Sequence, residues 1–513
     1  MQVSWIYKRP SARALWAGWF MLCLVIAFVH FQTLEFDPPV NQDEVQIIDL
    51  GRTILDPGSG WSVTWYVQGA HPTQYYTYLG LIFQEWAAQA SIPSNLGPRL
   101  LSMLAAIFAA SCALGWLLAR GTVPIVSLLI ALAFLLDPIF SDIYRGGRID
   151  GWALGACMAS CALLCIARKR AGNGLPVRVS AFIAGALLAL SFFFWASAPI
   201  LYPLVLMECY YLARVLHRNR ADRQDSWLEA AGVFAAGVLF ALLVLAIPVL
   251  LEFGIFAASA RAMFESQSLV AGVQNPVFGL FAVYDPALLL AVMAAFLVRR
   301  EWGVLIALIF ALLLAQRTAI YLPRITYLLP YGLAVIAFAW QGPLQGRFGP
   351  YANVTRFATL ALLLVFNGYL VLLQRPAIAK AQYPANDPHQ LLTTMQAAVG
   401  PGDHRVLLEE WQLYYAGRAL GWNMFLHSNP VGEQRYTEFL STMDYVIMRE
   451  EFGWYNVYNK LEPAGFVFKT SVSFAPPAST VTDVLGIELA VPQVRYPTVH
   501  IYEKAQTGTS LTD

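Results

Sequence analysis

The sequence predicts a polytopic α-helical membrane protein of about 11 spans that carries interfacial helices and a small α/β domain at its C-terminal end. Of the 513 residues, 58% are hydrophobic and only 13% are charged, whereas soluble domains carry about 25% charged residues. Apolar runs that are long enough, or nearly so, to cross a bilayer recur from residue 14 to about residue 373. Beyond about residue 376, charged, aromatic and apolar residues mix as they do in a soluble fold.

The first apolar run covers residues 14–32 and follows Lys8, Arg9 and Arg13. It is too long for the apolar core of a signal peptide, and no small-residue cleavage site follows it cleanly. We therefore expect a retained first span whose N-terminus lies in the cytoplasm.

The first external loop, residues 33–97, is expected to hold two helices. Residues 45–51 form an amphipathic pattern, and residues 74–91 combine tyrosines with Trp86, which are residue types suited to the bilayer interface. We expect residues 74–91 to lie flat on the membrane. If they crossed it instead, every later segment would be inverted.

Ten further spans are expected after this loop. The basic clusters between them then fall on the same side as the N-terminus, as the positive-inside rule requires, and residues 376–513 lie on the extracytoplasmic face. Residues 1–375 would form the transmembrane unit. The ten spans are expected at residues 98–119, 123–140, 151–167, 180–195, 198–213, 228–251, 286–298, 302–316, 325–340 and 357–373.

The C-terminal segment has the length of a small independent domain. A break is expected at residues 384–388, because Pro384 and Pro388 flank Ala-Asn-Asp. Glu409 and Glu410 are interpreted as solvated surface, and the tyrosines and tryptophans suit either carbohydrate stacking or an aromatic core. We expect strands at residues 406–408, 445–448 and 499–502 and helices at residues 390–399 and 434–443.

Charge and cysteine usage exclude several classes of protein. A net charge of +1 argues against a nucleic-acid-binding protein, which normally shows a concentrated basic face. The six cysteines lie in or beside apolar segments and form no Cys-x-x-Cys pair, so we expect neither an extracellular disulfide framework nor a cysteine metal site. Cys157, Cys161 and Cys165 share one helix face, a pattern typical of small-residue helix packing.

Two carboxylates, Asp43 and Glu44, lie a few positions after the first span, next to Asn41. Membrane insertion does not require carboxylates there, and a general base for a reaction at the membrane surface would suit this position. The alternative interpretation is a plain helix start, where acidic residues interact favourably with the helix dipole.

Two later external loops add cationic residues. Residues 136–151 include Arg145, Arg148 and Asp150, and charges at the bilayer edge are unfavourable unless they are paired or face water or polar groups. An arginine fork matches phosphate, but Arg–Asp pairs that cap the adjoining helices are an equal alternative. Basic residues outside the membrane run against the usual bias, and a further external loop carries Arg317, Tyr321 and Arg324.

These residues, together with His71, all fall on one expected face of the membrane. Transfer of a group from a lipid-linked phosphate needs a carboxylate that deprotonates the acceptor hydroxyl. It also needs cations that stabilise the departing phosphate. The expected face supplies both.

The order of these features resembles the GT-C membrane glycosyltransferases. One span is followed by Asp43-Glu44, a surface helix, the Ala70-His71-Pro72 element, a second surface helix and Arg99. This order is most similar to bacterial relatives of the protein O-mannosyltransferases and of the lipid A aminoarabinose transferases. The Arg145–Asp150 loop and the residues from Arg324 to Pro330 also resemble that family.

The resemblance implies inverting transfer of a sugar from a polyprenyl-phosphate donor to an envelope lipid, glycan or protein. The reaction would take place on the extracytoplasmic face of a bacterial-type inner membrane. Asp43 would be the base and Glu44 its support, and the donor or phosphate ligands would be Arg145, Arg148, Arg317, Tyr321 and Arg324, oriented by Asp150 and His71. His71 departs from the Lys-Pro form of the aminoarabinose enzymes, which leaves its role and the donor sugar open.

Members of this group generally need no metal, and we expect no cofactor here. Asp43 and Glu44 would point about 100° apart on a helix, which is poor geometry for chelation. A transporter or lipid flippase is the alternative function, although its charges would lie near the bilayer midplane. A polymerase or ligase of lipid-linked glycans is a second alternative function.

Overall fold

The computed structural model describes most of the chain. Of the residues interpreted above, His71, Arg317 and Tyr321 lie outside the described part, as does most of the span expected at residues 286–298. The continuous described ranges are residues 11–56, 77–218, 226–251, 301–315, 326–339, 349–426, 438–449, 458–474, 476–492 and 498–505, and isolated positions between 253 and 296 and Arg324 are also described.

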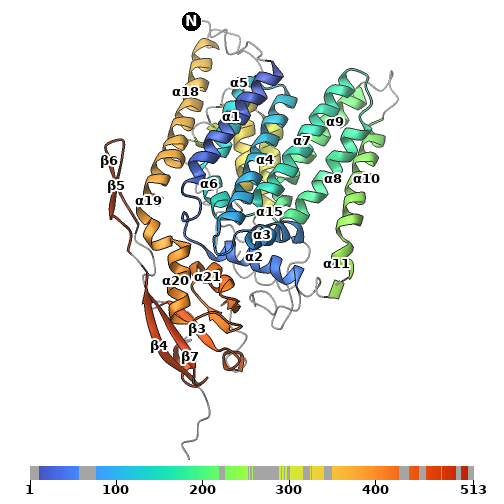
Figure 1. The fold of residues 1–513 in the computed structure, drawn as a ribbon. Helices are drawn as coiled ribbons and strands as arrows, with labels where there is room; N and C mark the ends of the chain where they lie inside the picture. The colour runs from blue at the N-terminus through green and yellow to red at the C-terminus, as the bar shows by residue number, and fades with distance from the viewer. Residues whose placement is uncertain are drawn as a thin grey trace, which may run out of the picture.

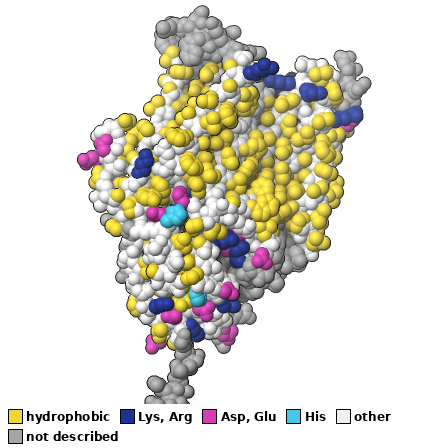
Figure 2. All heavy atoms as spheres, viewed as in Figure 1, with side chains coloured by type: hydrophobic (Ala, Val, Ile, Leu, Met, Phe, Trp, Pro, Cys, Tyr) yellow, Lys and Arg dark blue, Asp and Glu magenta, His cyan; other side chains and the backbone are white. Residues whose placement is uncertain are grey.

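A bundle of apolar helices forms the larger part of the molecule (Figure 1). In the described residues, six helices are long and apolar enough to cross a membrane, or seven if one bent pair is a single span. The chain is therefore a multispan membrane protein, and Figure 2 shows a broad apolar surface over the bundle with Lys and Arg gathered at its upper edge. The six are Ala12–Phe31 (α1), Leu96–Arg120 (α4), Asp150–Gly172 (α7), Ala198–Arg218 (η3 and α9), Trp227–Leu245 (α10) and a stretch within Phe357–Ala398.

Shorter apolar helices complete the bundle. They are α8 (Arg178–Phe194), α15 (Trp302–Ala315) and the η5–α17 segment (Thr326–Phe338), while α11 (Ile247–Leu251) follows α10. Small residues allow close packing between the long helices α4 and α7. Gly151 and Gly155 of α7 lie against α4, and the α7 residues Cys157, Cys161 and Cys165 are buried free thiols.

The span expected at residues 123–140 is broken. α5 (Pro124–Leu135) and α6 (Pro138–Arg145) meet at an angle of 56°. The Asp137 carboxylate accepts hydrogen bonds from the backbone N–H groups of Ile139 and Phe140, both at 3.0 Å, and Pro138 has no N–H with which to continue α5. Asp137 therefore caps α6 through its own carboxylate.

Two helices follow α1 and precede α4. α2 (Gln42–Leu55) includes the amphipathic helix predicted at residues 45–51, and α3 (Tyr78–Gln89) falls within residues 74–91. Figure 1 shows both at the lower end of the bundle. The position of residues 74–91 on a membrane surface stays a prediction.

The last long helix continues well past the expected domain boundary. α18 (Gly349–Gly368) runs through the π-helical η6 (Tyr369–Gln374) into α19 (Arg375–Asn386). Pro384 lies inside α19, so the break comes at Asp387 and not at Pro384. The Asp387 side chain caps α20 (Pro388–Ala398), the helix expected at residues 390–399, by accepting the His389 N–H at 3.0 Å.

The C-terminal segment folds around a five-stranded sheet with the order β2-β1-β3-β7-β4. β1 pairs in parallel with β2 and β3, and β7 is antiparallel to β3 and β4. All three predicted strands are present, so the α/β prediction is confirmed; the helix predicted at residues 434–443 lies partly outside the described residues. The strands are β1 (Arg405–Leu408), β2 (Asn423–Leu426), β3 (Tyr445–Arg449), β4 (Phe466–Ser473) and β7 (Thr498–Lys504).

The core of this segment extends into the helices between α1 and α4. Val45 and Ile48 of α2 and Ala88 of α3 are fully buried in one apolar cluster with α20, β1 and α21 (Tyr414–Ala419). The short helices η7 (Trp411–Leu413) and α23 (Tyr458–Leu461) and a separate hairpin of β5 (Val481–Val484) and β6 (Ile487–Ala490) complete the segment. α2 is therefore packed between the bundle and the C-terminal sheet.

Candidate functional site

Asp43 lies in the first turn of α2. Asn41 caps this helix, because its side-chain oxygen accepts the Glu44 N–H at 3.0 Å. The Asp43 side chain is 36% exposed and opens into a cleft of about 310 Å³. The cleft is lined by Asn41, Asp43, Pro138, Ile139, Asp142, Ile143, Gly146 and Arg148.

Three of the predicted site residues contact one another here: Asp43 and Arg148 line the cleft, and Asp150 lies behind Arg148. Arg148 Nη1 donates to Asp43 Oδ2 at 2.5 Å, and Arg148 Nε donates to Asp150 Oδ2 at 2.8 Å. Arg148 and Asp150 are buried, and the Arg148 guanidinium lies 5.7 Å from the centre of the Trp195 ring. Asp150 therefore fixes the side of the guanidinium that faces away from Asp43.

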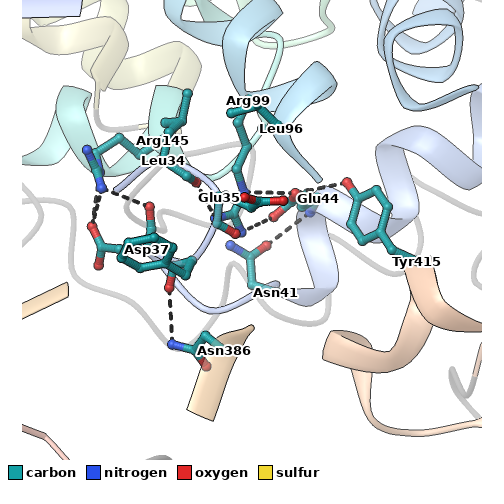
Figure 3. A network of polar contacts seen from close by, with 12 residues as sticks. Leu34, Glu35, Asp37, Asn41, Glu44, Leu96, Arg99, Arg145, Asn386 and Tyr415 are labelled. Atoms are coloured by element: carbon teal, nitrogen blue, oxygen red, sulfur yellow. Dashed lines mark hydrogen bonds and ion pairs between the residues drawn. The ribbon is translucent and has the colours of Figure 1, made fainter. Parts of the chain in front are cut away.

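Glu44 has a different environment from its neighbour. Its side chain is fully buried and forms a two-point ion pair with Arg99, with Nε–Oε1 at 3.1 Å and Nη2–Oε2 at 2.8 Å. The Tyr415 hydroxyl donates to Glu44 Oε1 at 3.0 Å (Figure 3). Burial, together with the nearby Glu44 carboxylate, raises the pKa of Tyr415 well above its usual value, so this hydroxyl stays a donor.

Arg99 connects α4 to the segment between α1 and α2. Its Nη1 donates to the Leu34 carbonyl oxygen at 2.8 Å and to the Glu35 carbonyl oxygen at 3.4 Å (Figure 3). One fully buried guanidinium thus holds both the start of α2 and the chain that leads into it.

Arg145, expected as a phosphate ligand, is fully buried and does not line the cleft. Its Nε and Nη2 donate to Asp37 Oδ2 at 3.0 and 2.6 Å, and Nη2 also donates to Thr33 Oγ1 at 2.9 Å. Its Nη1 lies 2.6 Å from His30 Nδ1. Direct contact with a phosphate would require this cluster to open, because the guanidinium is already occupied on all sides.

Arg375, which sequence reasoning missed, completes the cluster. It contacts Asp37 Oδ2 at 2.7 Å and Asp142 Oδ1, on the wall of the cleft, at 2.7 Å. Burial alone would raise the pKa of Asp37, but the Arg375 and Arg145 guanidiniums hold it below its usual value. A basic residue directly after the last span, on the expected external side, was the available signal.

Helix α21 places two further side chains against buried carboxylates. The Tyr414 hydroxyl donates to Asp49 Oδ1 of α2 at 3.1 Å, and Arg418 pairs with both oxygens of Glu85 of α3 at 2.6 and 2.9 Å. Asp49 and Glu85 are buried. No local pattern predicts these contacts, since the partners lie more than 300 positions apart in the chain.

The similarity of this chain to known proteins lies in its structure. No protein-family model and no curated protein matches the sequence. The arabinofuranosyltransferase AftD from Mycobacteria superimposes with a TM-score of 0.55 at 15% identity, over 97% of this chain and 40% of that chain. ArnT from Cupriavidus metallidurans, bound to undecaprenyl phosphate, gives a TM-score of 0.55 at 14% identity, over 95% of this chain and 98% of that chain.

This chain has the GT-C fold. The apo state of the same ArnT agrees, with a TM-score of 0.55 at 13% identity. The resemblance predicted from the position of Asp43-Glu44 is therefore confirmed at the level of fold. The chain spans less than half the length of AftD and nearly the whole length of ArnT.

Of the other predicted ligands, Arg324 belongs to the described residues. Arg324 is partly buried just before η5, while Arg317, Tyr321 and His71 lie outside the described residues. Their relation to the cleft stays a prediction. Within the described residues, no group of three or more His, Cys, Asp or Glu side chains is placed to hold a metal ion.

Proposed function

We propose that this protein is an inverting glycosyltransferase that moves a sugar from a polyprenyl-phosphate donor to an acceptor hydroxyl on the extracytoplasmic face of the membrane. The observation that carries the proposal is the partly exposed Asp43 carboxylate, which lies beside Arg148 in a cleft of a GT-C fold. The ArnT structure contains bound undecaprenyl phosphate, which supports a donor of this class.

The lining of the cleft suits such a donor. Asn41, Asp43 and Arg148 form a polar part, while Pro138, Ile139 and Ile143 of α6 form an apolar part. A phosphate group would bind near the Arg148 guanidinium, whose fork can donate two hydrogen bonds. The apolar residues would contact the first isoprene units.

In the proposed step, Asp43 takes the proton of the acceptor hydroxyl. The acceptor oxygen bonds to the anomeric carbon on the side opposite the phosphate, and the bond from that carbon to the phosphate oxygen breaks. The electron pair of the broken bond leaves on polyprenyl phosphate, and Arg148 stabilises its charge. Phosphate binding to Arg148 would also release Asp43 from its ion pair.

The surrounding residues would act by positioning. Glu44, through Arg99 and Tyr415, would fix the first turn of α2 and hence Asp43, and Asp150 would fix Arg148. We reassign Arg145 from direct phosphate binding to holding Asp37, and through Asp37 also Arg375. His71, Arg317, Tyr321 and Arg324 remain proposed donor ligands. The acceptor would be an envelope lipid, glycan or protein.

The test compares envelope lipids and glycans by mass spectrometry in cells that lack the protein, in cells with it restored, and in cells with Asp43→Asn. We expect one saccharide addition to disappear without the protein and to stay at least about 100-fold reduced with Asp43→Asn, the scale of losing a general base. The lost mass identifies the sugar.

The matched control is Asp56→Asn, the same change at the exposed C-terminal end of α2. It should restore the addition, at protein levels equal to those of Asp43→Asn. If Asp43→Asn restores the profile fully, Asp43 is not the base, and transport of a lipid or solute becomes the next hypothesis to measure.

A further inference from the structure

We propose that the β5–β6 hairpin contacts the lipid bilayer through its turn residue Leu485. The proposal concerns the C-terminal sheet domain and is independent of the transfer chemistry. It rests on the backbone of the turn, on its exposure and on where the hairpin is anchored.

The turn has the wrong residue for an aqueous surface. Leu485 has φ 57° and Gly486 has φ 80°, and among the described residues Leu485 is the one non-glycine residue with positive φ. Two successive positive φ angles define the turn for which Asn-Gly is strongly preferred. A bulky leucine is disfavoured in this conformation.

Exposure adds a second unfavourable feature. Leu485 is 77% exposed, and the nearby Ile487 and Val481 are 52% and 45% exposed. An asparagine would relieve the backbone strain and remove the exposed apolar surface at one position. A leucine would be favourable at this position if the turn contacted an apolar environment and not water.

The contacts at the base of the hairpin indicate that this apolar environment is the lipid bilayer. The Ala478 N–H donates to the Ala381 carbonyl oxygen at 2.7 Å, and Gln382 Nε2 donates to the Pro492 carbonyl oxygen at 2.9 Å, so the base of the hairpin is fixed to α19. Figure 1 shows the hairpin beside α19, with its turn directed toward the end of the molecule that holds the spans.

The lengths of the hairpin and of α19 are consistent with a turn that reaches the level of the membrane spans. Leu485 lies five positions after Thr480, at the base, which is about 17 Å along a strand at about 3.3 Å per residue. The same distance along a helix takes about eleven residues. Counted back from Ala381 along α19, it reaches the π-helical η6, at the end of the span predicted at residues 357–373.

The exposed side of the helix that α19 continues is apolar. Leu362, Val365 and Leu373, on α18 and η6, are 59%, 70% and 45% exposed, as expected for side chains that face lipid. Asp483, which accepts the Gly486 N–H at 3.1 Å, and the exposed Glu488 stand just behind the turn. They restrict the contact to the turn itself, because carboxylates stay in the headgroup layer.

The decisive measurement is spin labelling of the full-length protein in nanodiscs of phosphatidylethanolamine and phosphatidylglycerol. Leu485→Cys carries the label at the turn, and Phe468→Cys carries it at a 55% exposed position on β4 of the same domain. The unsubstituted protein, whose six cysteines are buried or half-buried, gives the background. At Leu485→Cys we expect oxygen to relax the label several-fold more than a water-soluble nickel chelate, and at Phe468→Cys the reverse.

Equal behaviour of the two labels, or chelate access at Leu485→Cys, would overturn the proposal. Hydrogen exchange of the β6 amides in nanodiscs gives a second measurement with Leu485→Asn and Leu485→Met. Relief of turn strain alone predicts slower exchange in Leu485→Asn. Loss of a bilayer contact predicts exchange that is several-fold faster, with Leu485→Met unchanged, and slower or equal exchange in Leu485→Asn would also refute the contact.

Discussion

At the scale of single residues, side-chain direction separates the roles of Asp43 and Glu44. Consecutive residues on a helix point about 100° apart, so Asp43 reaches the cleft while Glu44 points at Arg99 and Tyr415. Of these two neighbours, Asp43 has access to the cleft and Glu44 does not, which is why the proposed base is Asp43.

Two carboxylates of the C-terminal sheet domain differ from expectation at the same scale. Glu409 and Glu410, interpreted from the sequence as solvated, are 2% and 3% exposed. They follow β1, and Glu410 pairs with Arg449 of β3 at 2.7 Å. Charged residues are normally expected at the surface, so nothing in the sequence indicates that these two are buried. Their burial depends on the parallel pairing of β1 with β3, which neither segment predicts alone.

The burial of Glu409 should make the stability of the fold depend on pH in the alkaline range. Burial, opposed by Arg449, raises its pKa from 4.5 to about 8. The fold therefore favours the neutral acid. The stabilisation is complete below the ordinary pKa and is lost as the pH rises through about 8.

Glu409→Gln should remove this loss. We expect the variant to unfold several degrees above the unsubstituted protein at pH 9 and at a similar temperature at pH 5, measured by thermal unfolding in detergent. Glu488→Gln, which alters an exposed carboxylate of β6, is the control. A difference between Glu409→Gln and the unsubstituted protein that does not vary with pH would contradict the assignment.

At the scale of elements, α2 organises the site because α3 and α21 pack against it. A methyl group added at Gly51 would collide with the Leu81 carbonyl oxygen of α3, so the two helices are in backbone contact there. On its other face, α2 receives Tyr414 and Tyr415 of α21. The orientation of Asp43 thus depends on the bundle and on the C-terminal sheet domain.

Gly51→Ala should separate α2 from α3. We expect a loss of roughly 1–3 kcal/mol of stability, the usual range for overpacking, and faster hydrogen exchange in α2. Gly18→Ala in α1, where a methyl group meets no atom within 4 Å, should leave both measurements unchanged. Equal behaviour of the two variants would show that the α2–α3 contact is not close.

Tyr415→Phe tests the contact between α21 and α2. The ring is kept, but Glu44 loses one donor, and a hydrogen bond to a charged group contributes about 1.5–3 kcal/mol. We expect a lower unfolding temperature and faster exchange at the start of α2. Tyr210→Phe, at a 63% exposed tyrosine, is the comparison, and an unfolding temperature equal to that of Tyr210→Phe would argue against the contact.

At the scale of the whole molecule, one buried cluster joins the bundle to the C-terminal sheet domain. Asp37, in the segment after α1, pairs with Arg145 of α6 and with Arg375 at the start of α19. Asn386, at the end of α19, donates to the Phe36 carbonyl oxygen at 3.1 Å (Figure 3). The helix that leads into the C-terminal domain is therefore fixed at both ends to the segment that precedes Asp43.

Asp37→Asn should weaken this connection. Removing one partner of a buried ion pair typically costs about 3–5 kcal/mol, and we expect a marked fall in unfolding temperature at pH 7. Because the pKa of Asp37 is held low, its stabilisation is present at neutral pH and is lost as the pH falls through that lowered value. The two unfolding curves should therefore converge in acid.

Asp142→Asn provides the comparison for this experiment. It removes the other carboxylate partner of Arg375, but its side chain is 58% exposed, and exposed pairs contribute less than about 1 kcal/mol. A fall as large as that of Asp37→Asn would show that Arg375, and not the buried Asp37–Arg145 pair, makes the connection.

The sequence by itself determined the membrane class, the position of the Asp43-Glu44 pair after the first span, and the three strands at residues 406–408, 445–448 and 499–502. Each of these follows from local features, namely the length of an apolar run, a period of hydrophobic residues or a short motif. The amphipathic helix at residues 45–51, which is part of α2, was predicted in the same way.

Only the tertiary structure decided which charges lie in the cleft. It paired Glu44 with Arg99 and Tyr415, which are 55 and 371 positions away. It also buried Arg145 and placed Arg375 against Asp142 of the cleft wall. Hydrogen bonds and ion pairs depend on positions in space that no local pattern encodes. The sequence does not distinguish an arginine that pairs with a buried carboxylate from an arginine that is free to bind phosphate. The packing around each side chain makes that distinction.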